Sequence, residues 1–274
     1  MCMVEWCNST FGPRMSLSAS TRRGLVTGYT ISQSAVIENS LVVTDVTPVQ
    51  FCVIWGTQDP ASARVEVFLD AEAKIPFADA VVRPESPAHP PAEDIGVMKV
   101  RVVGLKANTE YFFRTITTLK RNNAVYESPT YRVKTEAESK IVRNDVLLQK
   151  VSIGENDPAP GMVVIAYVDG ASYPVSGWVG DGVPAQFAAI DTNNFYSSQT
   201  HSNLELRGGE VISLTVFGGS LGSAEIQGTI PNESGGMQQL ARAVSFSSTG
   251  SSSSVSGQGS SSSGGGGCFI SVLY

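Results

Sequence analysis

The chain has 274 residues, of which 42% are hydrophobic and only 16% are charged, and its formal net charge is −6. A chain of this length can bury a substantial core in one or two domains. Its 27 glycines, 14 prolines and low charge favour many short strands joined by turns over helices. The acidic balance argues against a nucleic-acid partner, and no apolar run is long enough for a transmembrane helix.

Residues 1–39 show no sustained hydrophobic periodicity, so we expect an irregular or disordered N-terminal segment. This segment also lacks the continuous apolar stretch of a secretory signal. The pair Arg22-Arg23 is followed by an interrupted polar sequence rather than by an apolar run. We therefore expect no export signal here, which a wrongly assigned start codon would explain.

Residues 40–136 have the pattern of one β-sandwich domain. The proline-rich segment 85–92 is excluded from a central strand because proline has no N–H to donate to a ladder, so we expect a loop or an edge there. About seven short strands in a domain of this size are typical of a sandwich. The strands are expected at residues 41–46, 50–57, 64–68, 97–103, 111–113, 115–119 and 131–135.

Within this domain, residues 97–114 read as a strand, a tight corner and a second strand. Gly104 ends the first strand, and Tyr111 opens the second. A tyrosine at this place can turn its hydroxyl back onto the backbone of the corner. The first strand alternates as a sheet with one buried face does: Met98, Val100 and Val102 against Lys99, Arg101 and Val103.

Three side chains around this corner carry a family resemblance. Trp55 lies late in the second strand, Leu105 lies six residues before Tyr111, and Thr109 lies two residues before it. At these positions the domain resembles a fibronectin type III domain, although Ala107 stands where that family often has proline. The resemblance implies an immunoglobulin-like sandwich, a fold that hosts many unrelated binding roles.

Residues 145–231 form a second strand-rich region, separated from the first by a short polar hinge at 136–140. Turn sequences of the Asp-Gly, Asp-Pro and Gly-Gly type separate its strands. The pattern, with Pro-Ala-Pro-Gly at 158–161, resembles an immunoglobulin-like sandwich of the carboxypeptidase-regulatory or surface-repeat type. We therefore expect an all-β chain of two sandwiches. The strands of the second are expected at residues 146–153, 162–168, 173–179, 185–190, 211–217 and 224–230.

Residues 232–274 are predicted to form a flexible tail. Between 245 and 267 nearly every residue is serine or glycine, and such a segment cannot bury enough apolar surface to offset its ordering entropy. The tail ends in a glycine run followed by Cys268-Phe-Ile, which is similar to the box at the C-termini of bacterial surface or exported proteins. The resemblance implies attachment to the envelope through Cys268, by lipidation, by cleavage beside it or by cross-linking. An idle cysteine in a disordered tail is the open alternative.

No catalytic, cofactor or metal site is predicted. The string Gly-Gly-Ser-Leu-Gly at 218–222 matches a nucleophile elbow, but a strand pattern follows Ser220 and no histidine lies downstream, so a hairpin turn is favoured. His89 and His201 read as solvated loop residues. Cys52 reads as a small buried hydrophobe, and the four cysteines lack disulfide-framework or zinc spacing.

The second region offers two further groups of candidates. Tyr173 and Trp178 share one expected strand at an odd spacing, which places them on opposite faces, so one of them can be exposed and stack on a sugar or a peptide. The acidic candidates lack the spacing of a calcium loop, and we expect them to form turns. They are Asp157, Asp169, Asp181 and Asp191.

These features predict a non-enzymatic bacterial protein of the cell surface or the extracellular space. It would act in adhesion, spacing or protein–protein interaction, with a protein or glycan partner that the sequence does not name. The alternative is a carbohydrate-binding or accessory module of an extracellular enzyme system.

Overall fold

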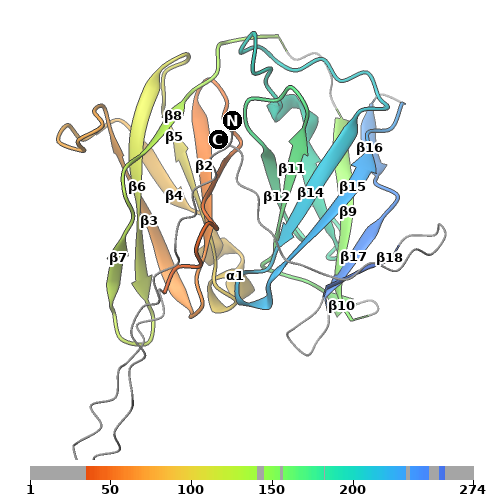
Figure 1. Ribbon diagram of the computed structural model, residues 1–274, viewed down its shortest axis with the longest axis horizontal. Helices are drawn as coiled ribbons and strands as arrows, with labels where there is room; N and C mark the ends of the chain where they lie inside the picture. The colour runs from red at the N-terminus through yellow and green to blue at the C-terminus, as the bar shows by residue number, and fades with distance from the viewer. Residues whose placement is uncertain are drawn as a thin grey trace, which may run out of the picture. The chain divides into compact units, whose positions relative to one another are not determined.

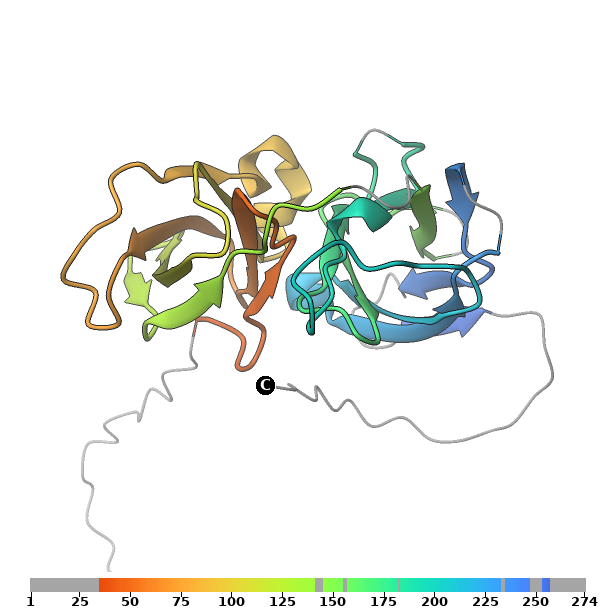
Figure 2. The ribbon, with the colours of Figure 1, turned by 90° about the horizontal axis from the view of Figure 1, so that it is seen from above.

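The computed structural model describes residues 35–140, 145–154, 157–181, 183–232, 235–246 and 253–256 (Figure 1). Strands dominate this part of the chain and are arranged in four sheets with mostly antiparallel pairing. The sheets stack as two sandwiches, coloured orange to yellow-green and green to blue in Figure 1 and Figure 2. The expectation of an all-β sandwich architecture is thereby confirmed.

The first sandwich joins two antiparallel sheets. The order of the first sheet is β1-β2-β5-β4, with β1 at Val42–Thr44, β2 at Gln50–Gly56, β5 at Val97–Val103 and β4 at Val81–Pro84. The second sheet contains β3 at Ala61–Phe68, β6 at Glu110–Leu119, β7 at Val125–Glu127 and β8 at Tyr131–Lys134. The proline-rich segment forms two short helices after β4, η1 at Ser86–Ala88 and α1 at Pro90–Asp94. Prolines at their first positions fit this geometry because a helix start does not need those N–H groups.

The predicted tyrosine corner is present between β5 and β6. The Tyr111 hydroxyl accepts a hydrogen bond from the Lys106 backbone N–H at 3.0 Å, and Leu105 beside it is buried. Trp55 is fully buried in the same core, and its indole N–H donates to the Thr117 hydroxyl at 2.9 Å. A buried indole needs such a partner. These contacts fix the corner that the sequence pattern predicts.

The second sandwich also has two sheets. One has the order β12-β11-β14-β15, with β12 at Val175–Trp178, β11 at Val163–Val168, β14 at Val211–Phe217 and β15 at Ser223–Thr229. The other is built on β9 at Asp145–Ile153, which pairs antiparallel with β10 at Asp157–Pro158 and β13 at Phe187–Asp191. Two short helices, η2 at Thr192–Asn194 and η3 at Gly219–Leu221, lie in its connections.

Part of the predicted tail is folded, contrary to the expectation for residues 232–274. Strands β16 at Gly236–Gln239 and β17 at Ala243–Phe246 pair in parallel with β9, and β18 at Ser253–Ser256 pairs with β17. Val244 is fully buried in the second core, and Leu240 and Phe246 are buried beside it. The prediction of a tail rested on the serine-rich composition and gave no weight to these few apolar side chains. Their burial is sufficient to hold residues 236–246 in the sheet.

Candidate functional site

The two sandwiches contact each other through an apolar cluster to which both contribute. The described residues of both lie within one compact unit, Ser34–Tyr274. We call this contact the junction. Its buried side chains are Ile54, Ala92 and Val97 from the first sandwich, and Val163, Ile165, Trp178 and Phe217 from the second.

The Gly-x-Ser-x-Gly string belongs to this junction. It forms η3, the turn between the antiparallel strands β14 and β15, as the hairpin interpretation predicted. The Ser220 backbone N–H and hydroxyl both donate to the Ile95 carbonyl of the first sandwich, at 2.7 and 3.0 Å. A Cβ atom on Gly219 would lie 2.1 Å from the same carbonyl oxygen. The glycine and serine of the string are therefore suited to close docking, and the serine hydroxyl is already engaged.

Four charged side chains of the first sandwich are gathered on the sheet face that the second sandwich covers. We call them the junction cluster: Asp45, Glu85, Lys99 and Arg101. The side chain of Lys99 is only 3% exposed, and its Nζ lies 3.3 Å from Glu85 Oε2 and 3.9 Å from Asp45 Oδ2. Arg101 Nε lies 2.5 Å from Glu85 Oε1. The two acids and two bases balance in formal charge.

Local structure brings these four residues together. Lys99 and Arg101 occupy alternate positions of β5, so both point away from the core of the first sandwich. Glu85 directly follows β4, the neighbour of β5, and Asp45 directly follows β1, which is separated from β5 by β2. The alternation in the sequence predicted that β5 has one buried face, the one that packs into the first core. The opposite face of β5 is also buried at Lys99, because the second sandwich covers it.

The second sandwich supplies hydrogen bonds to both carboxylates. The Ser176 backbone N–H donates to Asp45 Oδ1 at 2.9 Å, and the Ser176 hydroxyl donates to Asp45 Oδ2. The Asp45 backbone N–H donates to the Pro174 carbonyl at 2.9 Å. The Trp178 indole N–H donates to Glu85 Oε2 at 3.2 Å. Each acid of the junction cluster is thus held by both sandwiches.

The electrostatics of the cluster favour its charged forms. Burial alone would raise the pKa of Glu85, but Lys99 and Arg101 outweigh it, so this pKa lies below its usual value. Burial alone would lower the pKa of Lys99, but Asp45 and Glu85 help to hold it above its usual value. The pKa of the neighbouring Cys52 thiol is strongly raised, chiefly by burial, which keeps it a neutral, inert group as expected.

The two aromatic candidates both contact the first sandwich. Trp178 is 4% exposed, and His89 stacks on it with ring centroids 4.2 Å apart. The Tyr173 hydroxyl accepts a hydrogen bond from the Lys134 backbone N–H at 3.3 Å, and its ring packs beside the first core. The expected alternation between them does not apply, because β12 begins only at Val175. Both side chains thus serve the contact between the sandwiches.

The two histidines were expected to be solvated loop residues, but each lies close to an acidic side chain. Burial lowers the pKa of His89, although Asp181 lies 4.0 Å from its Nε2. His201 Nδ1 lies 2.9 Å from Oε2 of Glu136, a side chain that is 1% exposed. His201 therefore ties the segment after β8 to the second sandwich, a pairing of distant residues that no local pattern reveals.

Among the described residues, no cluster of three or more histidine, cysteine or acidic side chains is arranged to hold a metal ion. Two of the aspartates expected in turns lie in strands instead, Asp157 in β10 and Asp191 at the end of β13. Asp191 also caps η2 by accepting a hydrogen bond from the Asn193 backbone N–H at 3.0 Å. Cys268 lies outside the described residues. In the part of the chain that the structure covers, no helix has the length and apolar character needed to cross a bilayer.

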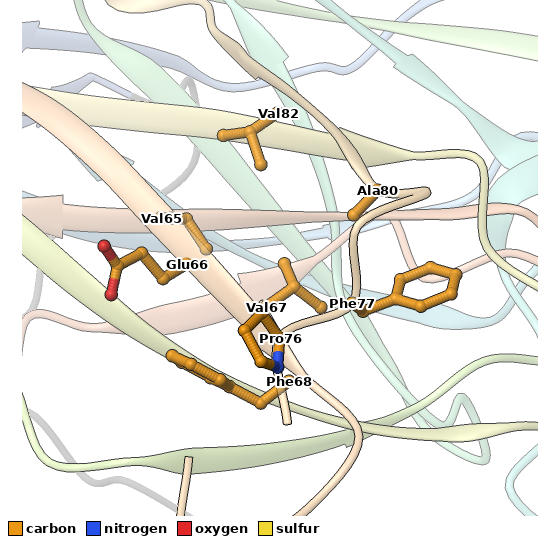
Figure 3. Close-up of a pocket in the computed structure, with 8 residues that line it drawn as sticks. All are labelled: Val65, Glu66, Val67, Phe68, Pro76, Phe77, Ala80 and Val82. Atoms are coloured by element: carbon orange, nitrogen blue, oxygen red, sulfur yellow. The ribbon is translucent and has the colours of Figure 1, made fainter. Parts of the chain in front are cut away.

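A second candidate site is an apolar cleft in the first sandwich, between β3 and β4 (Figure 3). Its cavity has a volume of about 300 Å³. In Figure 3 the carboxylate of Glu66 lies at the opposite end of the cleft from the Phe77 ring. The cleft is lined by Val65, Glu66, Val67, Phe68, Pro76, Phe77, Ala80 and Val82.

The surroundings of the cleft are also apolar. Leu69, Ile75 and Val81 are 47%, 54% and 48% exposed, although each lies in or beside the segments that form the cleft. Strands β3 and β4 are the edges of their sheets, and the cleft opens between them. The outer edge of β3 is already occupied at one end, because the Val67 carbonyl accepts a hydrogen bond from the Phe77 backbone N–H at 2.8 Å. Exposed apolar side chains beside a strand edge are features of a surface that receives an extended segment.

The chain matches no known family model and no curated protein. Its class therefore rests on the fold and the junction alone: an all-β protein in which two sandwiches share a buried, hydrogen-bonded contact.

Proposed function

We propose that this chain is a non-enzymatic bacterial protein of the cell surface or the extracellular space that acts in adhesion, spacing or protein–protein interaction. The observation that carries the proposal is the junction. Asp45 and Glu85 of the first sandwich accept hydrogen bonds from Ser176 and Trp178 of the second, around the buried Lys99. A rigid spacer holds its modules at a fixed angle, and buried, directional polar contacts supply such a constraint.

We also infer that both sandwiches are immunoglobulin-like and that the first is related to fibronectin type III domains. The order β1-β2-β5-β4 opposite β3, β6 and β7 corresponds to the ABED and CFG sheets of an immunoglobulin constant-type sandwich. The hydrogen bond from Lys106 to Tyr111 supports the same class. Domains of this class commonly present loops and strand edges to partners.

The partner that the surface favours is a protein with an extended segment. The cleft between β3 and β4 is apolar and lies between two sheet edges. A strand added to an edge, here that of β4, gains affinity from main-chain hydrogen bonds and specificity from side-chain pockets. The carbohydrate alternative has less support, because an aromatic platform for a sugar needs an open face, whereas Trp178 is buried against His89.

Fractionation of cells that express the gene with its natural upstream region tests the proposal. Recovery of the chain in the envelope fraction or the medium is the expected result. A chain confined to the cytosol, with a cytosolic enzyme and an envelope protein as markers, would overturn it. A glycan array run on the purified chain distinguishes the alternative, which predicts saturable binding to a defined sugar.

A further inference from the structure

The junction cluster contains the parts of an amide-forming reaction. A buried primary amine, Lys99 Nζ, lies 3.9 Å from the Asp45 carboxylate and 3.3 Å from the Glu85 carboxylate. We propose that Lys99 and Asp45 become joined by an intramolecular amide bond, with Glu85 as the proton carrier. This modification goes beyond the proposed function and does not depend on where the protein is located.

Each group has a role defined by its position. Lys99 is the nucleophile and Asp45 supplies the carbonyl carbon. Glu85 Oε2 is within reach of the protons on Nζ, as a general base must be. The Ser176 backbone N–H donates to Asp45 Oδ1 at 2.9 Å, where negative charge develops when the carboxyl carbon becomes tetrahedral. The Thr44 and Ser176 hydroxyls donate to Oδ2, the oxygen that leaves.

The reaction balances without any other reactant. Glu85 carries one proton from the Lys99 ammonium to Asp45 Oδ2, which gives a neutral amine and a carboxylic acid. The nitrogen lone pair then forms a bond to Asp45 Cγ, and the C=O electron pair moves onto Oδ1. Glu85 takes a second proton from the nitrogen and delivers it to Oδ2. The pair on Oδ1 re-forms the carbonyl, the Cγ–Oδ2 bond breaks, and one water molecule leaves.

The site favours this product over the ion pair. Burying a lysine and a carboxylate costs several kcal/mol per ion, and an amide removes both charges at once. The remaining pair, Glu85 and Arg101, stays balanced, so no charge is left without a counterion. The carboxylates keep Lys99 protonated at rest, because they hold its pKa above its usual value. Only a small fraction of the neutral pair is present at any time, and we expect the bond to form slowly after folding.

The bond would form only when the two sandwiches are docked, because Ser176 belongs to the second sandwich and Lys99 to the first. It would connect the end of β1 to β5 across the intervening β2. Such a link closes a loop of the first sandwich covalently, and a closed loop lowers the entropy of the unfolded chain.

Intact-mass spectrometry of the purified full chain tests the proposal. We expect a mass lower than that of the sequence by one water, about 18 Da, and a branched peptide that contains both Lys99 and Asp45 after proteolysis. The full sequence mass in a sample aged for days at ambient temperature would overturn the proposal.

Three variants assign the mass loss to this site, with near-ultraviolet circular dichroism as the check of folding. Lys99→Arg keeps the charge but is not expected to form the bond, and it should show the full mass. Glu85→Gln should slow the linkage by about a hundredfold, the usual value of a general base. Asp45→Asn should reach the same final mass as the linked natural chain, because it loses ammonia (about 17 Da) instead of water. A water loss that persists in Lys99→Arg, or a Glu85→Gln variant that links at the natural rate, would contradict the assignment.

Discussion

At the scale of single residues, the burial of Lys99 depends on both sandwiches. This residue lies on a short strand whose inward neighbours fill the first core, and its own side chain is 3% exposed under the second sandwich. Two carboxylates compensate its charge. A buried ion pair contributes little compared with an apolar replacement of the whole group, but the loss of one member leaves the others unpaired.

Replacing Lys99 with Met should therefore lower the free energy of unfolding by about 3–5 kcal/mol, since Asp45 and Glu85 would both lose the buried cation between them, and Glu85 would retain Arg101. Urea denaturation followed by tryptophan fluorescence measures the change. Lys106→Met is the matched control, because its side chain is exposed, and it should change stability by less than about 0.5 kcal/mol. Equal effects of the two substitutions would contradict this account of the cluster.

The same cluster predicts a dependence on pH. The pKa of Glu85 in the folded state lies below its usual value, so the unfolded state binds the proton more readily. The stability that Glu85 contributes is present above its unfolded pKa of about 4.3 and is lost as the pH falls through the folded value. The free energy of unfolding should therefore fall between about pH 5 and pH 3, less steeply in Glu85→Gln than in the natural chain. Parallel slopes in the two proteins would count against this assignment.

At the scale of elements, the turn η3 shows how a short segment fixes a contact between two sandwiches. Gly219 has a φ of +58°, and its missing side chain lets the Ile95 carbonyl approach. The next residue, Ser220, hydrogen-bonds that carbonyl twice. The motif therefore combines a positive φ with close packing, and both requirements select glycine.

Substituting Gly219 by Ala should destabilise the chain by about 1–3 kcal/mol more than the same change at Gly154, measured by thermal or urea unfolding. Gly154 has a similar φ of +63°, but a Cβ atom added there would have no other atom within 4 Å, so this position reports the backbone cost alone. The difference between the two substitutions isolates the clash with Ile95. Equal losses would show that η3 does not dock as described.

Strand β17 is one of several strands that the sequence pattern did not predict, as are β4, β7, β16 and β18. Because Val244 is fully buried, we expect β17 to contribute to the stability of the second core as the earlier strands do. We expect Val244→Ala to cost about 2 kcal/mol, whereas Val125→Ala, at a position 57% exposed, should cost less than about 0.5 kcal/mol. Chemical denaturation measures both. A negligible loss at Val244 would place residues 243–246 in the tail after all.

Short-range sequence patterns predicted those features that depend on neighbouring residues, namely most of the strands and the tyrosine corner. Alternating side chains located most strands, and the spacing of Leu105 and Tyr111 predicted the corner hydrogen bond. The candidate site could not be found in this way. The strand pattern placed Lys99 on a solvent-facing side of the sheet, and it made Trp178 a candidate for ligand contact. Their burial depends on contacts between residues that are far apart in sequence, such as Trp178 and Glu85, and no short-range pattern reports such a contact.

At the scale of the whole molecule, the junction decides what the two sandwiches can do together. The apolar residues Ile54, Trp178 and Phe217 exclude water from it, and the surrounding polar contacts define its register. Contacts between domains in one chain commonly allow relative motion unless the interface is large and hydrophobic. A buried charge cluster adds a cost to any rotation that separates its partners.

The distance distribution between one spin label in each sandwich tests the proposed rigid spacer most directly. Labels at Val125→Cys and Val211→Cys use exposed positions, in a chain whose Cys2, Cys7 and Cys268 are replaced by Ser. Pulsed electron paramagnetic resonance should give one narrow distance distribution, which broadens when Ser176→Pro removes the N–H that Asp45 accepts. A broad or multiple distribution in the otherwise natural junction would contradict the claim that the two sandwiches act as one unit.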